Sequence, residues 1–140
     1  MSLDRLKRIL EDVTSGWIPV YRGQDYEGTP YEGYYFFSED LDFAKEYGKV
    51  RKYQINVNNF FDMLNEDDFN YLLSEVGSVK DPYDDEEYDN YNDLVNNISS
   101  DTWEITENYL DYLTSKYNGI IIYEGGHRNY IVWNKDYIKE

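Results

Sequence analysis

Apolar residues recur at two different spacings along this chain, and the spacing separates the expected helices from the expected strands. Residues 3–13 carry apolar side chains at helical intervals, which predicts an amphipathic N-terminal helix. The apolar run Trp17–Tyr21 predicts a strand, and Pro19 within it indicates an edge position or a bulge. In the stretch Tyr34–Val57 an aromatic run precedes a helical repeat and then an alternating segment, which predicts strand, helix and strand.

Helical spacing dominates the middle of the chain. It predicts one helix over Glu66–Val76 and a second, shorter helix over Tyr91–Ile98. A longer helix is expected over Asp101–Tyr117, because Asp101 and Glu104 have the spacing of a capping box.

Strand signals return near the C-terminus. The uninterrupted apolar run Ile120–Tyr123 is typical of a central strand that is covered on both faces. A glycine-containing turn at Glu124–His127 leads into a returning strand at Asn129–Trp133, and a short last strand is expected at Tyr137–Lys139. Because strands gather at both ends of the chain and helices lie between them, the sequence predicts the α+β class.

The charge of the chain is strongly negative and unevenly distributed. Its 140 residues include 29 acids and 13 bases, a net charge of −16. Residues 62–100 hold 12 of the acids and one base, Lys80, so we expect a single domain over 1–140 with an acidic helical insertion at about 62–100. Such a chain repels phosphate backbones, which argues against direct nucleic-acid binding and favours a basic or nucleic-acid-binding protein as partner. The charge also serves solubility, and it favours a monomer.

Composition also bears on the cellular compartment and on metal binding. The absence of cysteine fits a reducing cytosol. No apolar run reaches membrane-spanning length and the N-terminus lacks a signal-peptide pattern, so we expect a cytoplasmic protein that does not contact a membrane. The single histidine, His127, falls in a turn and is interpreted as a solvated residue; without cysteine or a second histidine, no metal site is expected.

Three polar residues at expected strand ends form the candidate site. Arg22 precedes Gly23, which leaves room for a ligand, and its planar cation suits phosphate; a surface ion pair is the alternative. Ser38 stands where it either caps a helix or holds a ligand. Glu124 is either a carboxylate held in fixed geometry or a polar residue of the hairpin turn. With aromatic neighbours for stacking, the set suits a phosphate-containing substrate whose sugar becomes positive in the transition state.

Six short motifs follow one another in an order that is also found in a known family. They are Val20–Gly23, Gly33–Ser38, Phe43–Gly48, Tyr117–Ile122, Tyr130–Val132 and Ile138–Lys139. This order resembles ADP-ribosyltransferase-like domains, which typically have Arg or His in the first strand, an aromatic residue before Ser or Thr in the second, and a following A-x-x-Y helix. In size and layout the chain is similar to small versions from phages and mobile elements, including some anti-CRISPR ADP-ribosyltransferases. The resemblance implies a split β-sandwich and NAD as co-substrate.

Carried over to this chain, the resemblance implies six residues that bind NAD, one of which is Ser38. Arg22 would contact the phosphates or the ribose, and Gly23 lies directly beside it. Tyr35 and Phe37 would line or stack on the nicotinamide pocket, and Tyr47 would close it. The implied activity is that of a mono-ADP-ribosyltransferase that modifies a protein target, acting in the host cytoplasm if the chain is encoded by a phage.

The resemblance also implies the chemical step. Ser38 would support the nicotinamide ribose, and Glu124 would bond the ribose 2′-hydroxyl and stabilise the oxocarbenium-like transition state. Many arginine-modifying members have Glu or Gln two residues before the catalytic Glu; Ile122 stands there in this chain, which argues against arginine as the acceptor. Two alternatives remain open: a non-catalytic acidic inhibitor that mimics nucleic acid through Asp84–Glu87, and an NAD glycohydrolase.

Overall fold

The computed structural model describes residues 16–23, 33–46, 48–82, 86–98, 101–124 and 126–140. The helix expected over 3–13 therefore lies outside the described residues, as does Tyr47. Within the described ranges the protein is a mixed α+β structure, which confirms the predicted class.

A seven-stranded sheet forms the centre of the described structure, in the order β4-β7-β8-β2-β1-β3-β9. β4 and β7 run parallel, and every other neighbouring pair in the sheet runs antiparallel. The strands are β1 (Trp17–Gly23), β2 (Tyr35–Ser38), β3 (Val50–Asn56), β4 (Phe60–Asp62), β7 (Gly119–Glu124), β8 (His127–Val132) and β9 (Ile138–Lys139).

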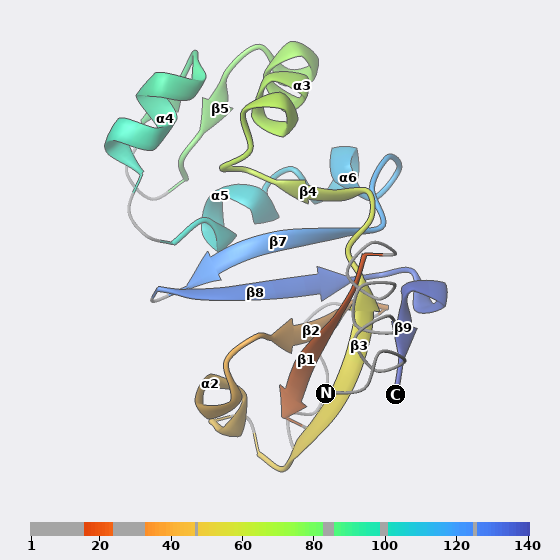
Figure 1. Ribbon diagram of the computed structural model, residues 1–140. Helices are drawn as coiled ribbons and strands as arrows, with labels where there is room; N and C mark the ends of the chain where they lie inside the picture. Colours follow the sequence, from red (N-terminus) through yellow and green to blue (C-terminus); the bar gives the residue numbers. More distant parts are fainter. Residues whose placement is uncertain (1–15, 24–32, 47, 83–85, 99–100, 125) are drawn as a thin grey trace, which may run out of the picture.

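The sheet curls, because strands from its two sides are joined by a very short connection. β3 ends at Asn56 and β4 begins at Phe60, although the two strands lie near opposite ends of the strand order. Figure 1 shows the consequence: β7 and β8 run across the picture, whereas β1 and β3 run steeply past them. We call the concave side the inner face; its core residues are Val20, Phe37, Ile55, Phe60, Ile121, Tyr130 and Val132.

Short helices cover the opposite side of the sheet, which we call the outer face. In Figure 1, α3 (Glu66–Val76), α4 (Tyr91–Asn97), α5 (Trp103–Glu107) and α6 (Leu110–Leu113) all lie on the far side of β7 from β1 and β3. A small second sheet, β5 (Val79–Lys80) with β6 (Glu87–Tyr88), joins this layer. The core that they share with the sheet is Phe61, Met63, Phe69, Leu72, Val79, Tyr88, Leu94, Ile105, Leu110, Leu113, Tyr117, Ile120, Ile122 and Ile131.

Two of the three predicted middle helices are confirmed, and the third is wrong in its length. α3 and α4 lie where helical spacing placed them, and each begins with an Asn whose side chain accepts a hydrogen bond from the helix backbone. The helix expected over Asp101–Tyr117 is broken into α5 and α6. The break falls at Tyr109, whose hydroxyl accepts a hydrogen bond from the backbone N–H of Lys80 and so ties the chain to β5. Asp101 accepts from the N–H of Trp103, and no capping box forms with Glu104.

The strand predictions are confirmed in position, but one inference from them is wrong. β1 is not an edge strand, since it lies between β2 and β3. β3 pairs with it along its whole length, whereas β2 pairs with it at Tyr21 only. Pro19 has no N–H to donate, but β2 does not extend along β1 as far as Pro19. No hydrogen bond to β2 is therefore lost there, and the proline is tolerated. The predicted hairpin is confirmed, with Glu124 opposite His127.

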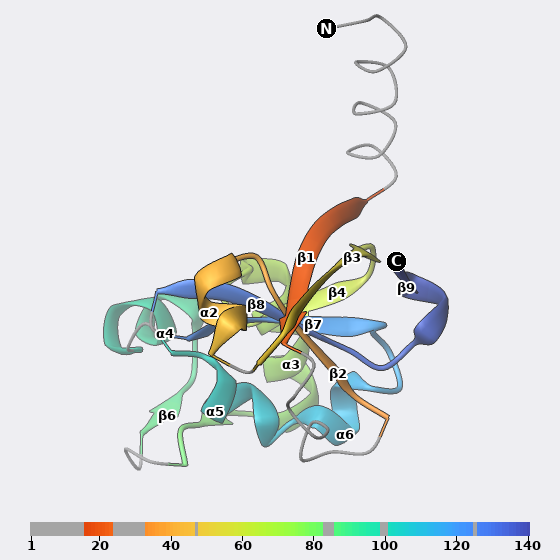
Figure 2. The same cartoon turned by 90° about the horizontal axis from the view of Figure 1, so that it is seen from below.

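The described helices are all short, and none of them combines the length and the apolar character that crossing a membrane requires. Seen from below, in Figure 2, α2 (Leu41–Lys45) lies beside β8 and away from β9. It packs against β1, β2 and β3.

Candidate functional site

The register of β1 and β2 brings three of the predicted site residues to one face of the sheet. Tyr21 lies opposite Ser38, so Arg22 lies opposite Phe37, and side chains alternate between faces along each strand. Arg22, Phe37 and Tyr35 therefore share the inner face, where Phe37 is only 1% exposed.

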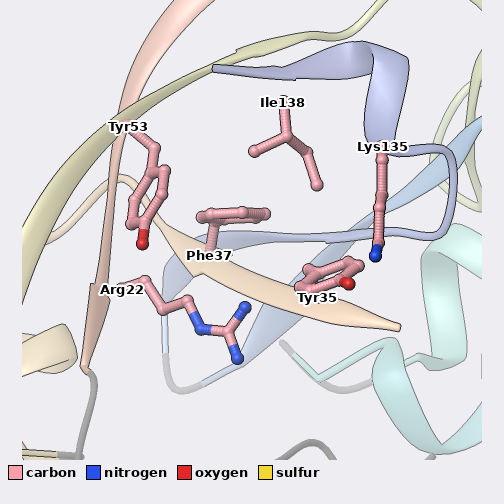
Figure 3. Close-up of a pocket in the computed structure, with 6 residues that line it drawn as sticks. All are labelled: Arg22, Tyr35, Phe37, Tyr53, Lys135 and Ile138. Atoms are coloured by element: carbon pink, nitrogen blue, oxygen red, sulfur yellow. The ribbon is translucent and has the colours of Figure 1, made fainter. Parts of the chain in front are cut away.

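These three residues line a hollow together with three that the sequence did not single out. The hollow has a volume of about 260 Å³, and its lining is Arg22, Tyr35, Phe37, Tyr53, Lys135 and Ile138. In Figure 3 the guanidinium of Arg22 and the ammonium of Lys135 both extend toward the ring of Tyr35. The Arg22 Cζ lies 5.2 Å from the centroid of that ring, and the Lys135 Nζ lies 5.8 Å from it. Both distances are in the range of cation–π attraction.

Packing fixes the aromatic wall of the hollow. The rings of Phe37 and Tyr53 meet edge to face, with centroids 5.4 Å apart and an interplanar angle of 66°. Tyr53 comes from β3, next to β1, and Ile138 comes from β9, opposite Ile55. Lys135 is held in a short 3₁₀ turn, Lys135–Tyr137, whose first residue follows the cap Asn134. The alternation of Tyr53 along its strand was the one sequence signal that pointed to this face; Lys135 carried none.

The hollow is positively charged within a strongly negative protein. Arg22 and Lys135 are the charged residues of its described lining, and no carboxylate belongs to that part of the lining. Within the described ranges, neither cation has an ion-pair partner among the salt bridges of the structure. Because the chain carries a net charge of −16, two such cations on one ring are an uncommon concentration of positive charge here. The hollow is therefore suited to an anion that also has an apolar, planar part.

Ser38 lies on the other face of the sheet and does not contact the hollow. It is 1% exposed, and its Oγ accepts a hydrogen bond from the backbone N–H of Asp40 at 3.0 Å. The helix cap is Asp40, whose carboxylate accepts from the N–H of Phe43 at 2.8 Å. The prediction of Ser38 as the cap is therefore wrong: α2 begins at Leu41, and Ser38 stabilises the turn before the cap. Gly23 is buried and also faces away from the hollow, opposite Val50.

Glu124 is not brought to the hollow either. Ile122 belongs to the outer core, so Glu124, two residues on, faces the outer side, whereas Arg22 faces the inner side. Their strands β7 and β1 are separated by β8 and β2, which is about 14 Å along the sheet at about 4.8 Å per strand. The structure thus groups Arg22, Tyr35 and Phe37, and leaves Ser38 and Glu124 apart from them.

The surroundings of Glu124 are acidic. Burial raises the pKa of the Glu124 carboxyl, and the nearby charges of Asp101 and Glu104 raise it further. We call these three residues the acidic rim. Thr102 holds it in place, because its N–H donates to the carbonyl of Tyr123 at 2.9 Å and its Oγ1 accepts from the N–H of Tyr123 at 3.1 Å.

The carboxylates on the same face as the hollow are others. Glu39 accepts a hydrogen bond from the hydroxyl of Tyr130, the residue opposite Phe37 on β8. Asp62 accepts from the hydroxyl of Tyr123 at 3.3 Å. Burial raises the pKa of Asp62, although its hydrogen bonds and the charge of Arg128 act against the shift. Both carboxylates lie outside the lining of the hollow.

His127 and Asn129, both near the start of β8, differ in their exposure to solvent. His127 is half-exposed, as its solvated interpretation requires, and its Nδ1 lies 3.2 Å from the Oδ2 of Asp40. In the described part of the chain, no group of three or more His, Cys, Asp or Glu side chains is placed to bind a metal ion. Asn129 is fully buried opposite Ser38, and both polar atoms of its side chain lack a hydrogen-bond partner. No pattern in the sequence predicts this unpaired amide.

Comparison with known proteins does not assign the chain. No protein-family model, no curated protein and no solved structure matches it.

Proposed function

We propose that this protein binds NAD through the hollow and acts as a mono-ADP-ribosyltransferase on a protein target. The observation that carries the proposal is the convergence of Arg22 and Lys135 on the ring of Tyr35, in a hollow with no carboxylate among its described lining residues. The resemblance of the sequence motifs to ADP-ribosyltransferase-like domains supports NAD as the ligand. A split β-sandwich is the finer fold that we propose for the curled sheet.

The hollow supplies the binding step. Arg22 and Lys135 attract the phosphates, and the partly exposed rings of Tyr35 and Tyr53, backed by the buried Phe37, provide apolar surface for a base or a ribose. A site for a drug-sized ligand usually has about 300–1,000 Å³. At about 260 Å³ the hollow holds one half of a dinucleotide, and the other half lies over the neighbouring surface.

The transfer step breaks the bond between C1′ of the nicotinamide ribose and the ring nitrogen. The acceptor nucleophile forms the new bond to C1′ and loses its proton, and nicotinamide leaves with the bonding electrons. A carboxylate near C1′ would stabilise the positive charge that develops there. The resemblance assigns this role to Glu124, whereas Glu39 lies on the same face as the hollow, so both carboxylates enter the test.

Binding and transfer are tested separately. Calorimetric titration with NAD is expected to show binding that Arg22→Met weakens about tenfold, since a hydrogen-bonded charge contributes about 1.5–3 kcal/mol. Lys52→Met is the matched control, because Lys52 is an exposed cation of β3 beside Tyr21. If the two variants lose equal affinity, overall charge accounts for binding and the hollow is not the site.

Transfer is measured by mass spectrometry of candidate protein targets after reaction with NAD. A target that gains the mass of ADP-ribose supports the transferase, and release of free ADP-ribose without a modified target supports a glycohydrolase. Loss of transfer in Glu124→Gln alone would support the role that the resemblance implies, and loss in Glu39→Gln alone would move the role to Glu39. If NAD binds and neither product forms with any target, the enzymatic proposal fails.

A second candidate function rests on the helical layer. Of residues 62–100, the described part contains one cation, Lys80, and many exposed carboxylates, among them Glu86 and Glu87. Asp84 and Asp85 lie outside the described residues. A non-catalytic inhibitor would use this layer to occupy the nucleic-acid groove of a basic protein. It is favoured if substitution of Glu86 and Glu87 by Gln abolishes partner binding while Arg22→Met has no effect.

A further inference from the structure

The two halves of NAD differ in charge, and the hollow is able to distinguish them. One half is an adenosine phosphate, with a neutral base and an anionic phosphate. The other half is a nicotinamide ribose phosphate, in which the oxidised ring carries a positive charge. A site lined by cations attracts the phosphate of either half but repels a cationic ring.

The lining of the hollow has the polarity that selects the first half. We propose that the hollow holds the adenosine-phosphate half and that the nicotinamide half lies outside it, an inference that rests on the proposed NAD binding. Arg22 and Lys135 lie within 5.2 and 5.8 Å of one ring centroid, so a ligand ring in contact with Tyr35 would be close to both charges. The lining that the structure describes holds no carboxylate to offset them. This places Tyr35 and Phe37 against the adenosine half and not against nicotinamide.

The groups that favour a cationic ring lie beyond the hollow on the same face. Phe37 is a lining residue, and its neighbour across the strands, Tyr130, holds the carboxylate of Glu39. Glu39 is exposed, and no ion pair within the described ranges neutralises it. Asp62 lies farther along this face, and Arg128, over the ring of Tyr130, offsets part of the negative charge there. Among the described residues, a dinucleotide that places its adenosine-phosphate half against Arg22 reaches these carboxylates only after it leaves the hollow.

The volume of the hollow also indicates that only one half of NAD lies inside it. Its 260 Å³ accommodate one nucleotide rather than two, so the protein must select which half to enclose. Charge makes this selection, because the partly exposed rings of Tyr35 and Tyr53 offer stacking surface to the ring of either half.

Two mononucleotides isolate the effect of the ring. AMP and nicotinamide mononucleotide share a ribose 5′-phosphate and differ in the charge of the ring. Calorimetric titration of the full chain is expected to show AMP binding at least fivefold more tightly. The double variant Arg22→Met, Lys135→Met should weaken AMP more than nicotinamide mononucleotide, because the latter loses a repulsion together with an attraction. The ratio of the two dissociation constants should then approach one, and Lys52→Met should leave the ratio unchanged.

The outcomes separate this inference from the proposed function. If nicotinamide mononucleotide binds as tightly as AMP, or more tightly, the assignment of the halves is overturned while NAD binding stands. If AMP binds but NAD does not, the polarity of the hollow stands and the proposed NAD function fails. If none of the three ligands binds, both are overturned. If the double variant weakens both mononucleotides equally, the cations do not select between the rings.

Discussion

The hollow and the acidic rim lie on opposite faces of one sheet and differ in almost every physical respect. The hollow combines Arg22 and Lys135 with aromatic rings, and within the described ranges no carboxylate lines it. The acidic rim combines Glu124 with Asp101 and Glu104, and these charges raise the pKa of Glu124. One region concentrates cations in an acidic protein and the other concentrates like charges against each other. The two cations of the hollow would attract an anion, whereas the three carboxylates of the acidic rim repel one another and lower the stability of the fold when they are charged.

The largest effect on the free energy of unfolding is expected from a substitution in β7, the strand that contains Glu124. A Cβ at Gly119, the first residue of β7, would lie 2.5 Å from Cζ of Phe60 and 2.7 Å from the carbonyl oxygen of Ile131. Gly119→Ala should therefore lower the free energy of unfolding by about 3 kcal/mol. Urea unfolding followed by tryptophan fluorescence measures the loss.

A second glycine serves as its control. Gly77 has a φ of +83°, and a Cβ there would meet no heavy atom within 4 Å. Gly77→Ala should cost about 1–3 kcal/mol, because only the strain of a backbone with φ 83° and ψ −43° opposes it. A negligible loss in Gly119→Ala would show that the contact between β7 and β4 is looser than the structure has it.

The next effect concerns the strand between the two regions. Asn129 lies on β8, between β2 and β7, and both polar atoms of its buried side chain lack partners. Asn129→Leu should raise the free energy of unfolding by about 1–2 kcal/mol, because a buried unsatisfied polar group carries its desolvation cost uncompensated. Thermal unfolding of this variant is compared with that of Asn92→Leu, which changes an exposed residue of α4. Destabilisation by Asn129→Leu would mean that the amide makes a hydrogen bond.

Neutralising the rim should give a smaller, pH-dependent gain. The pKa of Glu124 is raised in the folded protein, so the folded state holds this proton more tightly than the unfolded chain does. Stability from this group is present at low pH and is lost as pH rises through the raised pKa. Glu124→Gln should therefore match the wild type at acid pH and exceed it at pH 8 by up to about 1 kcal/mol.

Unfolding measured across this pH range, with the exposed Glu75→Gln as reference, tests the sign. A wild-type protein that gains stability relative to Glu124→Gln as pH rises would show that the carboxylate has a favourable partner. In that case the contrast between the rim and the hollow would no longer hold.

The smallest effect at neutral pH is expected from Tyr117, in the core under the helical layer. Burial raises the pKa of Tyr117 to about 12, and the charge of Asp68 contributes to the shift. In the unfolded chain this tyrosine side chain ionises near pH 10. Because the folded protein keeps it protonated up to about pH 12, the free energy of unfolding falls between about pH 10 and pH 12. At pH 8, Tyr117→Phe should change the free energy of unfolding by less than about 0.5 kcal/mol. Between pH 8 and pH 11 the variant should lose less of its stability than the wild type does. Tyr112→Phe, which changes an exposed tyrosine, should behave as the wild type at both pH values.

The sequence predicted the positions of the helices and strands better than it predicted on which face of the sheet each site residue lies. Hydrophobic spacing predicted α3 to its residue limits and placed β7 and β8 correctly, because periodicity reports local structure directly. It grouped Arg22, Ser38 and Glu124 because each ends a strand, but a shift of one residue along a strand reverses the face. That reversal separates Ser38 from Phe37, its neighbour in the chain. Lys135 joined the site through the return of β9 to β3, a long-range pairing without a local signal.

The order of strands also determines when the protein can fold during synthesis. β7 and β8 come from the last quarter of the chain, yet they lie between β4 and β2 in the sheet. Until they leave the ribosome, β4 has no sheet neighbour and β2 keeps an unsatisfied edge. Pairings of such long sequence separation slow folding and leave apolar strands exposed in the meantime. The sheet is therefore expected to close only after β8 has left the ribosome, and truncation before Gly119 should yield an aggregating fragment.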